Sequence, residues 1–459
     1  MYQIDFNKPL HVHFIGIGGI SMSGLAEILL AQSFPISGSD TKKSPLTLGL
    51  EEKGAKIFYG QRPSNIEDDV ELVVYTAAIH PDNPEFIAVK EKGIPSLSRA
   101  ELLGQIMKNY DTPIAISGTH GKTTTTSMIS QILLSHNVDP TLSIGGILKS
   151  INGNIRVGKS GYFVTEACEY TNSFLSFYPK IAIILNIEED HMDFFKDIQD
   201  IRKSFQKFSS LLPKDGTLII NGDIDHYEEI LKDTKCNVIT YGSKPSFDYS
   251  LSNITYNKFA RGTYTLNRKN SVPQEISLSV PGEHNIYNSM ASIALADLLN
   301  IPPAVSANAL LDFLGTDRRF DYKGTIGGVT IIDDYAHHPT EIRATLIAAK
   351  NYPHKTTWCV FQPHTYTRTK TFLDDFAKSL SLADKVVLAD IYAARETDHL
   401  GISSEVLQKK IQELGTQCFY FPSFDEIENF LLENCINGDL LITMGAGDVV
   451  KIGENILGI

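Results

Sequence analysis

The segment 113–135 constrains the fold of this chain more than any other feature. An apolar run at 113–117, typical of a buried strand, leads directly into Gly-Thr-His-Gly-Lys-Thr-Thr at 118–124, and a helical pattern with its apolar residues on one face follows. A glycine turn between a strand and a helix points backbone N–H groups and the positive end of the helix dipole at one spot, which suits phosphate groups. The segment therefore predicts an α/β domain with a phosphate-binding loop.

The loop departs from the common pattern Gly-x-x-x-x-Gly-Lys-Ser/Thr, because Ile116 stands at the position of the first glycine. A shortened loop still leaves Lys122 to neutralise the β- and γ-phosphates of ATP and Thr123 to bind Mg²⁺ through its hydroxyl. The residues predicted to bind ATP here are Gly118, Thr119, His120, Gly121, Lys122, Thr123 and Thr124. A surface turn is the alternative, and the agreement of strand, glycines, Lys-Thr pair and helix argues against it.

Two further strand ends carry acidic residues. Val-Thr-Glu-Ala-Cys-Glu at 164–169 ends one predicted strand, and Asn-Ile-Glu-Glu-Asp-His-Met-Asp at 186–193 ends the next. The carboxyl ends of parallel strands meet at one edge of a sheet, where ligands gather. Glu166 and His191, together with Thr123, are therefore predicted metal ligands, and this oxygen-rich set favours Mg²⁺ or Mn²⁺ over zinc. A structural hydrogen-bonding role is the alternative for His191.

The same alternation of β-branched runs and helical patterns occurs on both sides of this central unit. It predicts an α/β chain of three domains: a Rossmann-like domain at 1–107, a central ATPase-type parallel sheet at 108–315 and a second Rossmann-like domain at 316–459. Between 248 and 280, short alternating strands with turn residues predict a small antiparallel excursion from the central sheet.

A glycine turn also follows the first predicted strand, and an acid closes the second. This resembles the dinucleotide fingerprint, although Ser21 stands at its third glycine position. Because a glycine turn at a helix N-terminus suits a pyrophosphate, we predict a diphosphate site here. Its residues are Gly16, Gly18, Gly19, Ser21 and Asp40. A strand-end cap is the alternative for Asp40.

Composition disfavours several classes of partner. The net charge of −13, from 41 basic and 54 acidic residues, argues against a broad surface for nucleic acid. No apolar run reaches the roughly 18 residues that span a bilayer, and the first ten residues lack a secretory core. The five cysteines are scattered without a Cys-x-x-Cys pair, as expected of reduced thiols. We expect a cytoplasmic protein that binds neither nucleic acid nor membrane.

Taken together, the motifs strongly resemble the Mur ligases, which are three-domain, ATP-dependent amide-bond ligases of peptidoglycan synthesis. The resemblance covers essentially the whole chain in order. It rests on the loop at 118–124, the two acidic segments, Pro-Gly-Glu-His-Asn-Ile-Tyr-Asn at 281–288 and Arg-Arg-Phe at 318–320. One departure is Cys168, which stands where the family often has aspartate.

Two further segments narrow the resemblance. Phe-Ile-Gly-Ile-Gly-Gly-Ile-Ser-Met-Ser-Gly at 14–24 and Asp-Asp-Tyr-Ala-His-His-Pro-Thr-Glu at 333–341 are similar to the members that add L-alanine. This implies that the carboxylate of UDP-N-acetylmuramate attacks the γ-phosphate of ATP, giving an acyl phosphate that the amine of L-alanine displaces. It also implies that the diphosphate site of the first domain holds the UDP-linked substrate. Two Mg²⁺ ions, amino-acid binding by the third domain, and a monomer or weak homodimer are further expectations.

Three alternatives remain at this point. One is a relative that attaches a recycled tripeptide to the same muramate; it typically carries a longer basic insert after the first acidic segment, whereas 170–179 is short and contains no Lys or Arg. An NAD-dependent oxidoreductase using the first glycine turn would leave 118–124 unexplained. A nucleotide-binding switch without catalysis would not turn over ATP repeatedly.

The resemblance also implies roles for residues beyond the loop. Adenine would be held by His284, Asn285 and Asn288, and the ribose by Asp334. His364 and Arg368, in a stretch at 361–369 typical of the alanine-adding members, would contact substrate. The catalytic residues would be Lys122, His191, Arg319 reaching toward the γ-phosphate, and His337 and His338 lining the reacting cleft. A histidine pair on such a turn otherwise caps a helix or forms surface hydrogen bonds.

Overall fold

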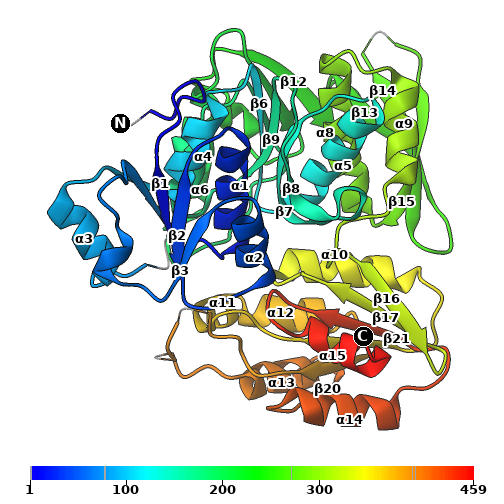
Figure 1. Cartoon of the computed structure of the whole chain (residues 1–459). Coiled ribbons are helices and arrows are strands. Elements are labelled where there is room, and N and C mark those ends of the chain that lie inside the picture. The colour runs from blue at the N-terminus through cyan, green and yellow to red at the C-terminus, as the bar shows by residue number, and fades with distance from the viewer. Residues whose placement is uncertain (1–2, 77–78, 270, 395, 399) are drawn as a thin grey trace.

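The computed structural model of the chain describes residues 3–76, 79–269, 271–394, 396–398 and 400–459 (Figure 1). Its strands form three sheets, of five, ten and six strands in chain order, with helices packed around them. The predicted three-domain α/β fold is confirmed. In Figure 1 the third domain lies below the other two, and α10 faces the central domain.

The first sheet is entirely parallel, with the order β3-β2-β1-β4-β5. Its strands are β1 (Val12–Ile15), β2 (Ile36–Asp40), β3 (Lys56–Tyr59), β4 (Leu72–Tyr75) and β5 (Ser96–Ser98). The helices are α1 (Ile20–Ala31), α2 (Pro45–Glu52), α3 (Pro84–Lys92), α4 (Arg99–Met107) and the 3₁₀ turn η1 (Pro63–Asn65). The run at 71–78 predicts a longer β4; Ala77 and Ala78 lie outside the described residues. The strand order reverses at β1, which places its glycine turn at the crevice where ligands bind in such sheets.

The central sheet has the order β15-β14-β13-β12-β11-β10-β6-β9-β7-β8. Its strands are β6 (Thr112–Ser117), β7 (Thr141–Leu148), β8 (Gly153–Arg156), β9 (Tyr162–Ala167), β10 (Ile181–Ile184), β11 (Thr217–Asn221), β12 (Asn237–Gly242), β13 (Tyr249–Tyr256), β14 (Arg261–Arg268) and β15 (Gln274–Pro281). The antiparallel excursion exists as β13 to β15 and is continuous with the parallel strands through β12. A second antiparallel pair, β7 with β8, was not predicted.

Helices cover both faces of this sheet. They are α5 (Lys122–Ser135), α6 (Ile198–Ser210), α7 (Tyr227–Ile230), α8 (Glu283–Leu298), α9 (Pro303–Asp312) and the 3₁₀ segments η2 (Lys149–Ile151) and η3 (Tyr170–Ser176). Strand β6 lies between β10 and β9, so the ends of these three neighbouring strands carry the phosphate loop and both acidic segments. The predicted meeting of these motifs at one sheet edge therefore follows from the strand order.

The third sheet has the order β16-β17-β21-β18-β19-β20 and is parallel except for the edge pair of β16 and β17. Its strands are β16 (Asp321–Ile326), β17 (Val329–Asp334), β18 (Thr357–Phe361), β19 (Lys385–Leu388), β20 (Gln417–Tyr420) and β21 (Leu440–Met444). The helices are α10 (Pro339–Lys350), α11 (Tyr366–Thr371), α12 (Leu373–Leu380), α13 (Ser404–Glu413), α14 (Phe424–Asn434) and α15 (Val450–Leu457).

The hydrophobic cores show how the domains are joined. One continuous cluster runs from Val12 and Leu102 of the first domain to Phe174 and Phe205 of the central domain. The third domain buries separate clusters around its own sheet. Its contact with the rest of the chain is therefore mainly polar, which suits a domain that moves during a reaction cycle. Among the described residues, no helix is both long and apolar enough to cross a membrane.

Candidate active site

The phosphate loop connects β6 to α5, and its glycines are required by its geometry. Gly118 and Gly121 have φ values of +144° and +82°, in the region that side chains rarely adopt. A Cβ on Gly118 would lie 3.1 Å from the backbone nitrogen of Asn186, and one on Gly121 would lie 2.7 Å from Oδ1 of Asn288. Asn186 also accepts the backbone N–H of His120 at 2.7 Å. Asn186 thus holds the loop by a hydrogen bond, and Asn288 lies too close to Gly121 for a side chain there.

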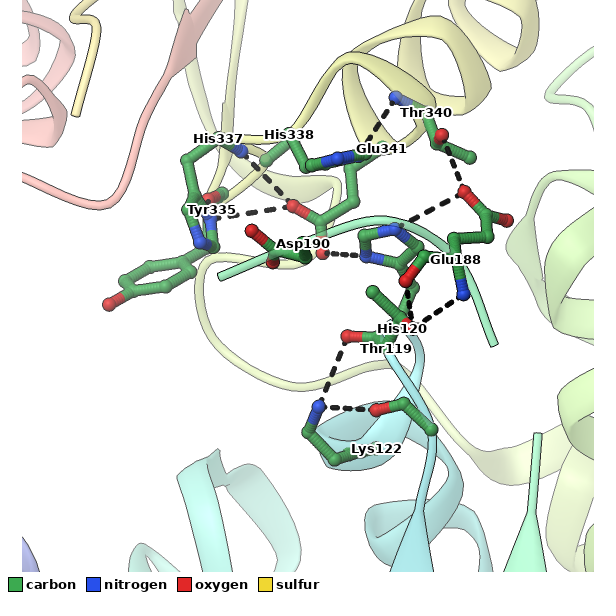
Figure 2. Close-up of polar contacts among 12 residues, drawn as sticks. Thr119, His120, Lys122, Glu188, Asp190, Tyr335, His337, His338, Thr340 and Glu341 are labelled. Atoms are coloured by element: carbon green, nitrogen blue, oxygen red, sulfur yellow. Dashed lines mark hydrogen bonds and ion pairs between the residues drawn. The ribbon is translucent and has the colours of Figure 1, made fainter. Parts of the chain in front are cut away.

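Lys122 begins α5 and turns back over this loop (Figure 2). Its Nζ donates to the carbonyl oxygens of Gly118 and Thr119 and lies 3.0 Å from Oε2 of Glu169. Burial opposes the charge on the ammonium, but the Glu169 carboxylate outweighs burial and raises the pKa of Lys122 above its ordinary value. The lysine is therefore a fixed positive charge at the mouth of the loop.

A cluster of potential metal ligands lies beside Lys122. The hydroxyl of Thr123 donates to Oε2 of Glu166 at 3.1 Å, which leaves the hydroxyl lone pairs available, and Oε1 of Glu166 accepts the backbone N–H of Gly145 at 2.5 Å. Burial raises the pKa of Glu166. Among the described residues, the buried Oε1 of Glu169 has no hydrogen-bond donor, and Nε2 of His191 lies 3.8 Å from it.

His191 is held in a fixed orientation in this cluster. Its ring stacks on that of Tyr170, with centroids 4.4 Å apart, and its φ of +53° places the backbone in the left-handed region. Burial lowers the pKa of His191, so the imidazole favours its neutral, metal-binding form. The donor types fit a hard divalent cation such as Mg²⁺: a hydroxyl, two carboxylates and a neutral imidazole, with one carboxylate oxygen that has no hydrogen-bond donor among the described residues.

A cavity of about 510 Å³ opens between the central and third domains, next to the phosphate loop. Burial lowers the pKa of His284 to about 4 and raises that of Asp334 to about 6. Asp334 accepts the backbone N–H groups of Phe320 and Ala336, both at 2.8 Å. The lining includes the predicted residues His120, Gly121, Thr124, His284, Asn285, Asn288, Arg319 and Asp334. It also includes Asn221, Asp223, Tyr241, Ser243 and Tyr287, which the sequence did not point to.

The two arginines of the linker have different environments. Arg318 donates through Nε to Asp333 at 3.0 Å and through Nη2 to the carbonyl of Gly445 at 2.7 Å, so it anchors the start of the third domain. Arg319 lines the cavity, and its guanidinium lies 5.0 Å from the ring centroid of Tyr335. Arg319 therefore faces the cavity, whereas Arg318 is not among the residues that line it.

His337 and His338 lie at the turn before α10. His338 caps the helix, because its Nδ1 accepts the backbone N–H of Thr340 at 3.3 Å, and its Nε2 donates to the carbonyl of Glu189 at 3.0 Å. Both ring nitrogens are thus engaged, which favours the capping role over catalysis. His337 donates through Nδ1 to the carbonyl of Tyr335 at 3.0 Å, and burial lowers its pKa to about 3.

The predicted substrate residues His364 and Arg368 contact each other, with Nη1 of Arg368 3.3 Å from Nδ1 of His364, but neither lines the cavity described above. Arg368 donates through Nη2 to Oδ1 of Asp190 at 2.8 Å. Although burial opposes the charge on Asp190, the guanidinium holds the pKa of that carboxyl well below its usual range. Arg368 therefore bridges the third and central domains in this conformation.

In the first domain, Gly16 has a φ of +82° and Gly19 caps α1 without a side-chain hydrogen bond. Asp40 accepts the backbone N–H of Gly18 at 2.8 Å and that of Thr41 at 2.7 Å, so it closes the turn in the manner of the strand-end alternative. The hydroxyl of Ser21 accepts from Nη1 of Arg99 at 3.0 Å. The N–H groups of Gly16, Ile17 and Gly18 therefore donate to Ser39 and Asp40, and the Arg99 guanidinium lies beside the start of α1.

Several residues of this site were not assigned from the sequence. Three of them belong to the recognised segments, where their acid or amide side chains could have indicated a role: Glu169, Asn186 and Glu341. No sequence pattern indicates a role for Arg99, which stands alone at the start of a helix.

Comparisons with known proteins agree with this architecture. Three family models match consecutive parts of the chain: "Mur ligase family, catalytic domain" at 11–111, "Mur ligase middle domain" at 116–296 and "Mur ligase, glutamate ligase domain" at 318–447. A protein of Lachnospira eligens named UDP-N-acetylmuramate–L-alanine ligase is 61% identical over 458 residues, covering 100% of both chains. A protein of Agathobacter rectalis with the same name is 61% identical over 457 residues, again covering 100% of both.

Solved structures give the same picture. A UDP-N-acetylmuramate-alanine ligase of Thermotoga maritima superimposes with a TM-score of 0.81 at 28% identity, covering 98% of each chain. A murein peptide ligase of Psychrobacter arcticus superimposes with a TM-score of 0.71 at 26% identity over 98% of each chain. The similarity therefore extends over all three domains.

Proposed function

This chain belongs to the Mur ligase family, and on that premise we propose that it joins L-alanine to the carboxylate of UDP-N-acetylmuramate, converting ATP to ADP and phosphate. The observation that carries the proposal is the phosphate loop with Lys122, which faces both the metal-binding cluster and the nucleoside cavity. The full-length relatives at 61% identity carry the name of the alanine-adding ligase, so the main interpretation stands over the tripeptide-adding alternative.

The arrangement suits phosphoryl transfer to a carboxylate. An amine cannot displace a carboxylate oxygen until that oxygen becomes a good leaving group, and transfer of the γ-phosphoryl group requires positive charge around it. Lys122 supplies a fixed charge on the loop side, and Arg319 supplies one from the third domain. The resulting acyl phosphate would then be attacked by the amine, with phosphate leaving.

Mg²⁺ would be held by Thr123, Glu166, His191 and Glu169, and when bound it offsets the negative charge of the β- and γ-phosphates. A second ion stays a prediction.

The other two ligands would bind at separate places. The nucleoside of ATP would lie in the cavity, held by His284, Asn285, Asn288 and Asp334. The diphosphate of the UDP-linked substrate would be held at the glycine turn of the first domain. His364 would contact substrate near Arg368. We also propose a cytoplasmic location, because the reaction consumes ATP. The oligomeric state, a monomer or a weak homodimer, stays a prediction.

The decisive experiment measures phosphate release with ATP, Mg²⁺ and UDP-N-acetylmuramate while each of the twenty amino acids is offered in turn. We expect release with L-alanine and weaker release with glycine and L-serine, because a methyl-sized difference is worth about 1 to 3 kcal/mol. Release that requires a tripeptide, or none with any amino acid, would contradict the proposed function.

The metal assignment has its own test. We expect His191→Ala to raise the Mg²⁺ concentration needed for half-maximal activity about tenfold or more and to lower kcat, because it removes one ligand of the cation. The measurement is a metal titration of phosphate release. His136→Ala is the matched control, because that histidine is exposed at the end of α5. An unchanged titration for His191→Ala would indicate a structural histidine.

A further inference from the structure

Three side chains of the third domain, those of Thr340, His338 and Arg368, contact one loop of the central domain. This loop follows β10 and contains Glu188, Glu189 and Asp190. The hydroxyl of Thr340 donates to Oε2 of Glu188 at 2.7 Å, and His338 and Arg368 bond Glu189 and Asp190 as described above. The structure therefore shows the third domain docked on the edge of the central sheet that carries the phosphate loop.

His120 lies at the centre of this contact. Its Nδ1 lies 3.1 Å from Oε1 of Glu341 in the third domain, and its Nε2 lies 3.5 Å from Oε2 of Glu188 in the central domain. The other oxygen of Glu341 accepts the backbone N–H of His337 at 3.1 Å. The side chains of His120 and Glu341 are 12% and 16% exposed, so the pair is largely shielded from water and salt. Figure 2 shows the imidazole between the two carboxylates.

The charge of His120 follows from these two neighbours. Burial opposes protonation, but the carboxylates of Glu188 and Glu341 outweigh it and raise the pKa of His120 to about 10. The ligand atoms of His120, Glu188 and His338 lie within 4.8 Å of one another. In this structure both ring nitrogens of His120 face carboxylates, one from each domain, and this geometry favours a link between the domains.

The main chain of His120 is fixed as well. Its N–H donates to Oδ1 of Asn186 at 2.7 Å, and its carbonyl accepts from Nδ2 of the same residue at 3.0 Å. His120 is only two positions before Lys122. The contact of its side chain with Glu341 therefore ties the third domain directly to the loop that carries the lysine.

We propose that His120 is a positioning residue that couples docking of the third domain to the phosphate loop, with Glu341 as its partner across the domain boundary. Docking then sets the loop and Lys122 in the same step that brings Arg319 to the cavity. This proposal rests on the proposed function, because its test measures ATP-dependent ligation. It gives His120 a role beyond contact with the nucleotide.

A double-mutant cycle tests this coupling. The variants are His120→Gln, Glu341→Gln and the double variant, with His136→Gln as the exposed histidine control. We expect each single change to lower kcat about tenfold and the double variant to lie within about threefold of the weaker single one, because both changes break the same link. The KM for UDP-N-acetylmuramate should stay within twofold, since its loop lies in the first domain.

Small-angle scattering supplies a readout independent of turnover. With the non-hydrolysable ATP analogue and UDP-N-acetylmuramate, the wild type should become more compact, and both single variants should respond less at unchanged melting temperature. A hundredfold fall in the double variant would show that the residues act separately and would overturn the proposal, as would full kcat in either single variant. Wild-type protein without ligase activity would instead contradict the proposed function, while scattering would still test the link.

Discussion

Replacing Lys122 with alanine should lower ATP turnover at least about thousandfold and leave the affinity for UDP-N-acetylmuramate nearly unchanged. The size of the first effect follows from the position of the ammonium, which is a buried, preorganised charge where negative charge must be stabilised during phosphoryl transfer. The second follows from the fold, because the glycine turn for the UDP-linked substrate belongs to a different sheet. The measurements are steady-state phosphate release and calorimetric titration with the UDP-linked substrate.

Two further variants make this result specific. Lys207→Ala removes an exposed lysine of α6 and should retain full activity. Lys122→Arg keeps the positive charge but replaces the compact ammonium, which donates to the loop carbonyls, with a planar guanidinium. This variant should therefore recover only a small part of the activity lost in Lys122→Ala. Steady-state activity comparable to wild type in Lys122→Ala would remove the role assigned to this lysine.

The phosphate loop could be read from the sequence because its geometry demands particular residues. Gly118 and Gly121 have positive φ, and the strand before them and the helix after them have clear periodicities. The alternation of strands and helices likewise predicted the three α/β domains. Of the edge pair, the β-branched run at 329–332 predicts β17, but no pattern predicts β16, which follows the linker, exposes Tyr322 and Ile326 and has no continuous apolar run.

Other assignments could not be decided by local pattern. The local sequence is the same whether Asp40 binds a ligand or caps the strand end. The cap is favoured by a contact in the structure, in which Oδ2 of Asp40 accepts the backbone N–H of Gly18 at 2.8 Å. The same holds for His338, whose ring nitrogens are both engaged. In each case the competing role depends on atoms supplied by another element, which periodicity does not report.

The contacts between domains were the least predictable part of the site. His120 and Glu341 are 221 positions apart, and neither lies in a pattern that points to the other. The sequence motifs assign His120 to ATP binding and give Glu341 no role. Such contacts depend on the angle at which two separately folded domains meet, and this angle is fixed by many small polar interactions.

Gly104 shows how such an interface can reverse an expectation from local sequence. It lies inside α4, where alanine is normally preferred to glycine by about 1 kcal/mol. In the fold, however, α4 packs against η3 of the central domain, and a Cβ on Gly104 would lie 1.9 Å from the carbonyl oxygen of Ser176. The added Cβ would be attached to the backbone of α4 and would meet the backbone of η3. Relief of this clash therefore requires the first and central domains to move apart.

We therefore expect Gly104→Ala to destabilise the protein by about 3 kcal/mol and to lower the first melting transition by several degrees. Activity should fall as well, because the glycine turn for the UDP-linked substrate would shift relative to Lys122. Calorimetric melting and phosphate release are the measurements. Gly49→Ala in α2 is the matched control: no described atom lies within 4 Å of its Cβ position, so alanine should stabilise that helix slightly. Equal melting temperatures for the two variants would mean that the first and central domains are not packed as closely as α4 and η3 indicate.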